Sequence, residues 1–195
     1  MIAKERGKPM KIFKTRILVE CGLMVALAMV LSFIPIFEMP MGGSVTLCSM
    51  APIVLISFWH GWKWGILAGG VNGVIQLLRG IKNVMICKTI WAMIGCILLD
   101  YLIAFTAMGL SCVFARGFKH RLVGVGVGTA VSGLIRYACS FLSGILIWGE
   151  YAPEDMPVWL YSLTYNGSYM IPEIILTVLV VVLIIKKFPR RDFVE

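Results

Sequence analysis

Long apolar segments separated by short polar connections constrain this chain more than any other feature. A helix needs about 20 mostly apolar residues to cross the hydrocarbon core of a bilayer. The chain is 59% hydrophobic and only 14% charged, against about 25% charged in an average soluble domain. We therefore predict an all-α integral membrane protein, a six-transmembrane-helix bundle that forms a single domain over residues 1–195. The expected spans are about 15–36, 47–60, 62–80, 89–115, 121–149 and 157–187.

Lysine and arginine residues are distributed unevenly among the connections. They gather before the first span, between the fourth and fifth spans and after the last span, whereas the alternate connections hold Glu38, Glu150, Glu154 and Asp155. By the positive-inside rule both termini are expected to be cytoplasmic, with 1–14 as a basic N-terminus and 188–195 as a tail. The net charge of +8 thus indicates membrane topology, with lipid headgroups rather than nucleic acid as its partner.

A polar stripe runs along the last predicted span. At about 100° per residue, its side chains fall within an arc of roughly 100°, while the remaining faces are apolar. Polar groups are costly in hydrocarbon, so the stripe is expected to face a cavity and to mark a ligand path. Its members are Ser162, Tyr165, Asn166, Tyr169 and Glu173.

Asp100 is the sharpest single clue, since no other charged residue lies between Lys88 and Arg116. It could form a structural pair with Arg136, the only basic residue deep in a span. Alternatively, it could be the counter-charge or hydrogen-bond acceptor for a cationic or amine-bearing ligand. Glu173 is a second possible partner for Arg136.

The predicted topology places several aromatic and polar side chains at one depth. The fifth span runs outward and the sixth runs back, so Ser140, Trp148, Tyr161 and Asn166 belong to the outer half and can share one outward-facing pocket. For Trp148 and Tyr161 the alternative is an aromatic belt at the membrane interface.

Small residues and glycines suggest two further roles. Gly22 and Ala26, with Ala28 nearby, form a groove that serves either internal helix packing or docking to a separate membrane subunit. Gly65, Gly69 and Gly73 recur every four residues in the third span and favour tight packing against another helix. The external segment 39–47 is either a flexible lid or a plain connector, and its candidate lid residues are Gly43, Ser44 and Thr46.

Motifs for soluble catalytic chemistry are missing from the sequence. It contains no GxxxxGK[ST] phosphate loop, no HExxH and no GxSxG, and its six cysteines form no CxxC pair. We expect no metal, no cofactor and no enzymatic activity, so uphill transport would take its energy from another protein or an ion gradient. An intramembrane enzyme that uses Asp100 and Glu173 as a carboxylate pair, and a self-sufficient ion-coupled carrier, remain alternatives.

Three segments resemble the thiamine-specific S components, the substrate-binding membrane subunits, of energy-coupling factor (ECF) vitamin transporters. These are LLDYLIAF (98–105), LIRYACSFLSG (134–144) and PVWLYSLTYNGSYMIP (157–172), with further agreement in GGSVTL and PIVLISFWHGWKWG. The resemblance implies a six-helix protein of the cell membrane that captures thiamine outside. It would then dock on a transmembrane T subunit with two cytoplasmic ATPases.

The resemblance also implies functional positions in this sequence. The ligand-contacting residues would be Asp100, Tyr101, Trp148, Tyr161 and Asn166, and the docking surface for the T subunit would be Gly22, Ala26 and Ala28. One position departs from the family, which commonly has a histidine where this chain has Ser140. Serine keeps a hydrogen-bond donor but loses the flat ring, so a thiamine precursor or another small vitamin is the alternative ligand.

Overall fold

The computed structural model describes residues 9–39 and 42–188. Most of the expected N-terminal extension and nearly all of the expected C-terminal tail lie outside these residues. The elements in chain order are α1 (Pro9–Ser32), β1 (Pro35–Glu38), β2 (Ser44–Thr46), α2 (Ala51–His60), α3 (Trp62–Arg79), α4 (Ile81–Ile86), α5 (Ile90–Cys96), a π-helical segment (Ile97–Leu102), α6 (Ile103–Met108), α7 (Ser111–Phe114), α8 (Arg121–Leu146), a 3₁₀ turn (Gly149–Tyr151) and α9 (Val158–Lys187).

Four of the described helical segments are long and apolar enough to cross a membrane. They are Lys14–Ser32, Ile90–Met108, Arg121–Leu146 and Val158–Lys187. The second of these is continuous, because α5, the π-helical segment and α6 follow one another without a break. The prediction of a helical membrane protein is therefore confirmed, whereas the count of six spans and the cytoplasmic termini stay predictions.

The sequence prediction needs correction in three places. The expected span 47–60 is only the ten-residue helix α2, and the expected span 89–115 ends at Met108, followed by the short α7. The fold is also not entirely helical, because β1 pairs with β2 in an antiparallel hairpin. Pro35 precludes a continued helix at the end of α1, and the intervening Gly42 and Gly43 adopt positive φ angles of 93° and 90° that allow the chain to reverse.

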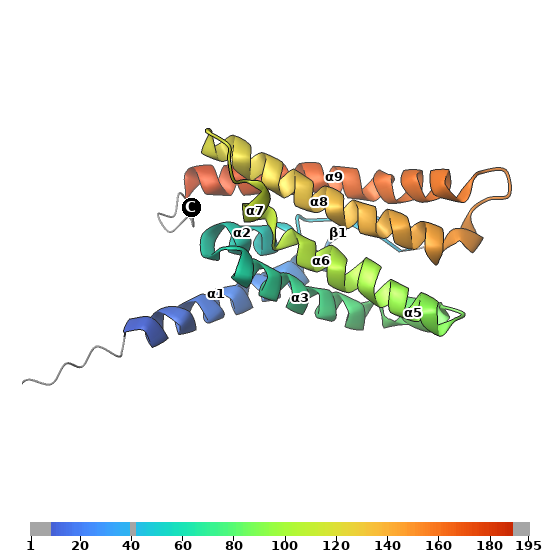
Figure 1. Ribbon diagram of the computed structural model, residues 1–195, viewed down its shortest axis with the longest axis horizontal. Coiled ribbons are helices and arrows are strands. Elements are labelled where there is room, and N and C mark those ends of the chain that lie inside the picture. The colour runs from blue at the N-terminus through green and yellow to red at the C-terminus, as the bar shows by residue number, and fades with distance from the viewer. Residues whose placement is uncertain (1–8, 40–41, 189–195) are drawn as a thin grey trace, which may run out of the picture.

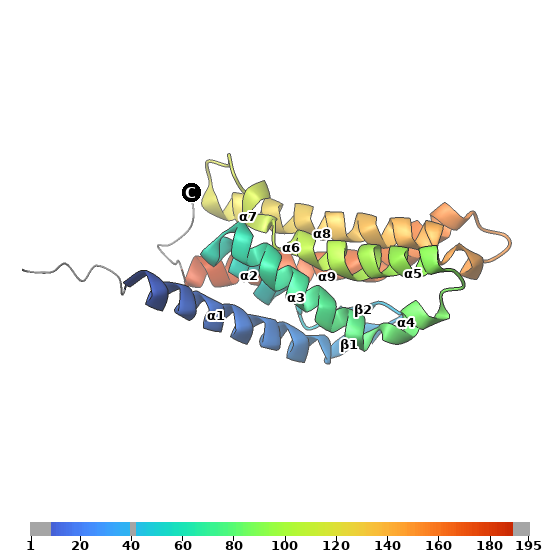
Figure 2. The ribbon, with the colours of Figure 1, turned by 60° about the horizontal axis from the view of Figure 1, so that its bottom comes forward.

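The helices form an elongated bundle with α8 and α9 side by side and antiparallel (Figures 1 and 2). The segment α5 to α6 packs between α8 and α3, and α2 is enclosed by α1, α3 and α9. Residues 51–58 of α2 are all buried, which explains why this short helix is mostly apolar. Helix α1 lies along the edge of the bundle and leaves one long face uncovered (Figure 2).

Helix α3 approaches α6 so closely that only glycine fits between them. A Cβ atom on Gly65 would lie 2.3 Å from the Gly109 carbonyl oxygen, and one on Gly69 would lie 2.6 Å from the Phe105 carbonyl oxygen. A Cβ on Gly73 would meet the Tyr101 carbonyl oxygen at 2.9 Å. The predicted tight packing of the three regularly spaced glycines is confirmed, and their partner is the helix that carries Asp100.

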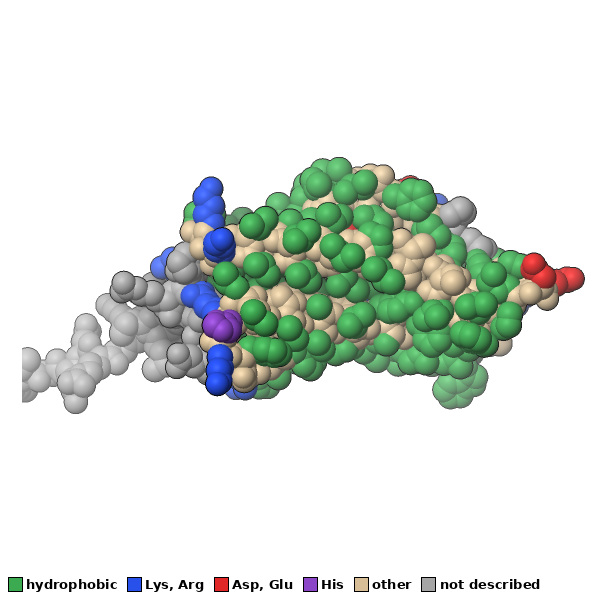
Figure 3. Space-filling view, turned by 90° about the horizontal axis from the view of Figure 1, so that it is seen from above, with side chains coloured by type: hydrophobic (Ala, Val, Ile, Leu, Met, Phe, Trp, Pro, Cys, Tyr) green, Lys and Arg blue, Asp and Glu red, His purple; other side chains and the backbone are tan. Residues whose placement is uncertain are grey.

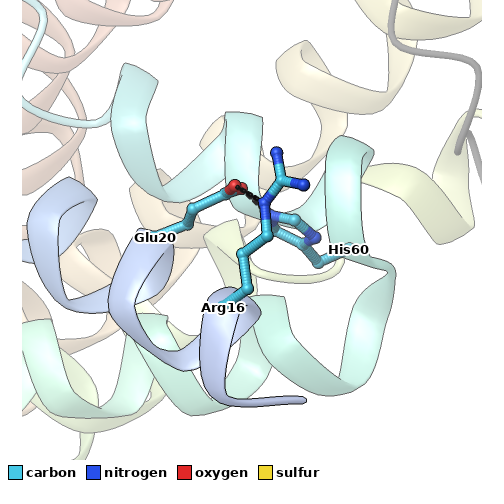
Figure 4. Close-up of polar contacts among 3 residues, drawn as sticks. All are labelled: Arg16, Glu20 and His60. Atoms are coloured by element: carbon cyan, nitrogen blue, oxygen red, sulfur yellow. Dashed lines mark hydrogen bonds and ion pairs between the residues drawn. The ribbon is translucent and has the colours of Figure 1, made fainter. Parts of the chain in front are cut away.

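Surface charge separates along the long axis of the bundle. In Figure 3, most visible Lys and Arg side chains lie at one end, acidic side chains lie at the other, and hydrophobic side chains cover the surface between them. At the basic end, Glu20 of α1 accepts a hydrogen bond from Arg16 Nε at 3.0 Å. Its other carboxylate oxygen is hydrogen-bonded with His60 Nε2 of α2, also at 3.0 Å (Figure 4). This cluster is a polar tie between α1 and α2.

Candidate functional site

A cavity of about 580 Å³ opens in the half of the bundle that carries the acidic end. This volume is within the range of about 300–1,000 Å³ that is usual for small-molecule sites. Its walls come from the hairpin, α3, the π-helical segment, α8 and α9. It brings together every predicted ligand-contacting and lid residue, namely Gly43, Ser44, Thr46, Asp100, Tyr101, Ser140, Trp148, Tyr161 and Asn166.

Asp100 is placed by the π-helical segment Ile97–Leu102. A π turn inserts an extra residue into the helical ladder, and such segments are frequent at functional sites. Asp100 Oδ2 accepts hydrogen bonds from Ser143 Oγ at 2.7 Å and from Trp148 Nε1 at 3.1 Å. The carboxylate is thus fixed by two side chains on or just beyond α8 and lines the cavity.

Tyr101 forms the neighbouring wall. Its hydroxyl donates to the Gly80 carbonyl oxygen at 3.1 Å and accepts from Asn83 Nδ2 at 3.3 Å, which joins the π-helical segment to the α3–α4 corner. A Cβ atom on Gly80 would lie 2.0 Å from the tyrosine oxygen, so glycine is needed there. Tyr101 therefore connects two elements besides lining the cavity.

Asn166 is held within the polar stripe of α9. Its Nδ2 donates to the Ser162 carbonyl oxygen at 2.9 Å and to the Ser140 carbonyl oxygen at 3.3 Å, and its Oδ1 accepts from the Tyr169 hydroxyl at 2.8 Å. These contacts fix the orientation of the amide and join α9 to α8. Ser140 lines the same wall of the cavity, as the sequence predicted. Its contact with Asn166 is made by its backbone carbonyl oxygen.

Three tyrosines stack along the same helix. The Tyr161 and Tyr165 ring centroids are 5.5 Å apart, and those of Tyr165 and Tyr169 are 6.3 Å apart in an edge-on arrangement. The Tyr165 hydroxyl also donates to the Gly42 carbonyl oxygen at 2.9 Å, which joins α9 to the hairpin turn. Together with Trp148, these rings give the cavity aromatic surfaces for a flat ligand.

The predicted lid is anchored inside the protein by Glu173. The Thr46 backbone N–H donates to Glu173 Oε2 at 2.6 Å and the Thr46 hydroxyl donates to Oε1 at 2.7 Å. Both residues are buried. Gly43 is packed so tightly against the Tyr169 ring that a Cβ there would lie 2.6 Å from it. The hairpin is thus fastened to α9, and its role as a lid stays a prediction.

Arg136 does not form the ion pair that the sequence suggested. Neither Asp100 nor Glu173 has a carboxylate oxygen within 4.0 Å of its guanidinium. The guanidinium instead lies over the face of the Phe105 ring, with its carbon 4.3 Å from the ring centroid. Each carboxylate has other partners, so the two expected pairings are both replaced by hydrogen bonds.

The expected docking residues lie away from the cavity on α1. Gly22 and Ala26 are exposed, and no heavy atom lies within 4 Å of a Cβ built on Gly22. Ala28 is only 1% exposed and packs into the core, so it does not share the outer face with the other two. The spacing of the residues explains this, because Gly22 and Ala26 are four apart whereas Ala28 is two residues further on.

Several residues that hold the cavity walls in place were not among the predicted contacts. Ser143 is the partner of Asp100, and Asn83 and Gly80 are the partners of Tyr101. The Ser140 and Ser143 spacing of three, which places both on one face of α8, was a signal that could have found Ser143. Nothing in the sequence around 80–83 pointed to the cavity. Within the described residues, no cluster of His, Cys, Asp or Glu could hold a metal ion.

The arrangement suits a particular ligand chemistry. A half-buried carboxylate next to an indole favours a cation, tyrosine rings favour a flat ring system, and an amide favours heteroatoms. The geometry therefore fits binding of a small cationic heteroaromatic molecule.

Comparisons with known proteins also point to a family that handles a small cationic heteroaromatic molecule, thiamine. The family model described as Thiamine transporter protein (Thia_YuaJ) matches residues 18–192. The chain is 38% identical over 184 residues to the thiamine transporter ThiT of Bacillus subtilis, covering 89% of this chain and 92% of the relative. It is 29% identical over 190 residues to ThiT of Lacticaseibacillus paracasei, covering 89% of each. The solved structure of ThiT from Listeria monocytogenes superposes with a TM-score of 0.73 at 25% identity, covering 90% of this chain and 96% of that one.

Proposed function

Since this chain belongs to the thiamine transporter family, as a multi-pass protein of the plasma membrane, we propose that it is the high-affinity thiamine-binding S component of an ECF importer. The observation that carries this proposal is the convergence of Asp100, Trp148, Tyr161 and Asn166 on one cavity. The family is one of transporters, which is a non-enzymatic function and agrees with the expectation that the chain is no enzyme.

In the proposed complex, Asp100 faces the positive charge of thiamine and Trp148 stacks on a ring of the ligand. Cation-π contacts of this kind contribute about 0.5–2 kcal/mol. Tyr101, Tyr161 and Asn166 complete the walls, and Ser140 supplies a smaller surface where the family commonly has histidine. The hairpin residues Gly43, Ser44 and Thr46 cover the ligand.

The proposed orientation places the cavity toward the outside. Its support is the separation of charge along the bundle, because the basic end is expected on the cytoplasmic side. The cavity residues of α8 and α9 lie in the half that ends in Glu150, Glu154 and Asp155. The vitamin would therefore be captured outside and released inside after docking.

Isothermal titration of the detergent-purified protein with thiamine tests the binding proposal. We expect one site with a dissociation constant well below micromolar. A folded protein that gives no heat at micromolar thiamine would contradict it. Because Ser140 replaces a ring, a competition panel of thiamine, hydroxymethylpyrimidine, riboflavin and biotin then tests the second candidate, an S component for a precursor or another small vitamin.

The proposed partners are a transmembrane T subunit and two cytoplasmic ATPases. The exposed Gly22 and Ala26 face of α1 supports this, since small residues let another helix approach closely. Ala26→Trp is expected to abolish uptake in cells that express the complete importer while thiamine binding by the purified variant is kept. Uptake into liposomes that hold this chain alone would instead favour a self-sufficient carrier.

A further inference from the structure

Two of the six cysteines lie next to each other at the end of the bundle that carries the acidic side chains. Cys87 directly follows α4, and Cys96 is the last residue of α5. Their side chains are hydrogen-bonding partners, and Cys87 Sγ also donates to the Asn83 carbonyl oxygen at 3.5 Å. Both thiols are buried in one small apolar cluster with Val84 and Tyr101.

The backbone between the two residues explains why they meet. Cys87 and Thr89 are extended, with ψ angles of 128° and 154°, so the chain advances about 10 Å from Cys87 to Ile90. The chain direction then reverses (Figure 2), and α5 rises about 9 Å from Ile90 to Cys96 at 1.5 Å per residue. The helix therefore brings Cys96 back level with Cys87.

The other four cysteines are packed elsewhere. Cys21, Cys48 and Cys112 lie in or against the core around α2, and Cys139 lies in a cluster with Ala104 and Phe105. Cys87 and Cys96 are thus set apart by their location and by their contact with each other.

A second cavity gives one of the two thiols access to the surface. It has a volume of about 320 Å³ and lies between the α4–α5 loop and the end of α8, with Cys87 among its lining residues. Trp148 lines both this cavity and the ligand cavity. Cys87 is 9% exposed, whereas Cys96 is 0% exposed. A reagent can therefore reach Cys87 first, with Cys96 directly behind it.

An accessible thiol with a buried thiol beside it is suited to thiol–disulfide exchange. The Cys87 sulfur attacks a disulfide-bearing oxidant, breaks its S–S bond and forms a mixed disulfide, while one half of the oxidant leaves as a thiol. The Cys96 sulfur then attacks the Cys87 sulfur and expels the other half. The two protein thiols are oxidised, and the oxidant takes up their two electrons and two protons.

The environment of Cys87 favours a lasting bond over a rapid sensor. Burial raises the pKa of its thiol above the ordinary value of 9.0, so little of the reactive thiolate is present at neutral pH. Rapidly reacting redox cysteines have lowered pKa values instead. Disulfides persist on the outer side of the cell membrane, which is where the proposed orientation places this end of the bundle.

We propose that Cys87 and Cys96 are a modification site, at which a disulfide-bearing oxidant on the outer side of the membrane closes a disulfide bond. The bond joins the end of α4 to the helix that carries Asp100 and Tyr101. The Tyr101 hydroxyl already connects this helix to Gly80 and Asn83 by hydrogen bonds. The disulfide adds a covalent link between the same two parts of the cavity wall, a role that goes beyond ligand binding.

Peptide mapping tests the site, because Lys88 lies between the two cysteines. Trypsin releases residues 83–88, which hold Cys87, separately from residues 89–116, which hold Cys96 and Cys112. The reduced, detergent-purified protein is treated with dipyridyl disulfide, its remaining thiols are alkylated, and it is digested without reductant. Mass spectrometry should find the two peptides linked through Cys87 and Cys96, with two hydrogen atoms lost and no pyridylthio group on either residue.

Two variants give the matched controls. Cys96→Ser should keep a pyridylthio group on Cys87, because the second displacement is lost. Cys139→Ser, which changes a buried cysteine of a different cluster, should give the same linked peptides as the wild type. The wild-type result decides by itself if a variant fails to fold. A wild type that keeps the pyridylthio group on Cys87, links Cys87 to Cys112 or leaves Cys87 unmodified would overturn the proposal.

The thermal midpoint tests whether the bond stabilises this corner of the bundle. Closing a short loop should raise the midpoint of the oxidised wild type by about 5–10 °C over that of the reduced protein. Cys87→Ser should have one midpoint with and without a phosphine reductant. Equal midpoints for the oxidised and reduced wild type would contradict the stabilising role of the link.

Discussion

Two of the acidic side chains that line the cavity, Asp100 and Glu173, lie in regions that hold them in different ways. Asp100 is bonded to Ser143 and Trp148, which belong to the wall of the bundle. Glu173 is bonded through both oxygens to Thr46, which belongs to the hairpin that lines the cavity. We infer from this comparison that Asp100, held by the wall of the bundle, can contact the ligand, whereas Glu173 holds the hairpin in place.

Asp100→Asn gives the largest expected effect. The amide keeps the shape and the oxygen that accepts from Ser143 but removes the negative charge. Loss of one partner from a buried charge pair costs about 2–4 kcal/mol, so thiamine affinity should fall roughly 30- to 1,000-fold by isothermal titration. Glu150→Gln, which removes an exposed acid at the same end, is the matched control. Unchanged affinity in Asp100→Asn would mean that this carboxylate is structural.

Glu173→Gln tests the other half of the comparison. The neutral amide has one acceptor oxygen, so it cannot replace the carboxylate that accepts from both the Thr46 backbone N–H and the Thr46 hydroxyl. The hairpin should therefore be held less tightly. We expect thiamine to dissociate about tenfold faster in stopped-flow tryptophan fluorescence, with a smaller change in the association rate. Thr46→Val removes the hydroxyl but keeps the backbone N–H contact, so its effect should be smaller. An unaltered dissociation rate would argue against Glu173 as the anchor.

Trp148→Phe and Ser143→Ala sharpen the account of how Asp100 is fixed. Each variant removes one hydrogen bond to Oδ2, and phenylalanine keeps a ring for stacking. A single bond of this kind contributes about 1 kcal/mol, so a loss of about three- to tenfold in thiamine affinity is expected for each. The double variant should lose more thiamine affinity than the product of the two single fold-changes, because Asp100 would then be free to turn away. Simple additivity would indicate that the carboxylate is fixed by other contacts.

The smallest effect is expected at the rim, where Lys88 forms an exposed ion pair with Glu150. This carboxylate raises the pKa of Lys88 above its ordinary value of 10.5. A raised lysine pKa contributes stability below the unfolded-state pKa and loses it only as the pH rises through the folded-state value. The thermal midpoints of the wild type and of Lys88→Gln should therefore differ little, and this small difference should stay constant between about pH 6 and pH 9. A clear divergence within that interval would show that the pair does more than join two loops.

Much of the candidate site could be predicted because its residues are unfavourable in lipid. Asp100 and the stripe on α9 are polar groups in apolar segments, and burial in a cavity is the usual way to avoid hydrocarbon. The partners of these groups could not be predicted in the same way. Thr46 and Glu173 are far apart in sequence, as are Tyr101 and Gly80, and helical periodicity describes only one element at a time.

The sequence by itself determined that the chain is a helical membrane protein and which helix faces are polar, because hydrophobic length and periodicity are local properties. The tertiary structure alone decided that Asp100 is bonded to Ser143 and Trp148, that Glu173 anchors the hairpin, and that Arg136 lies over the Phe105 ring instead of pairing with an acid. Each of these depends on how separate helices approach one another. That approach is set by close contacts such as Gly65 against Gly109, which no single segment specifies.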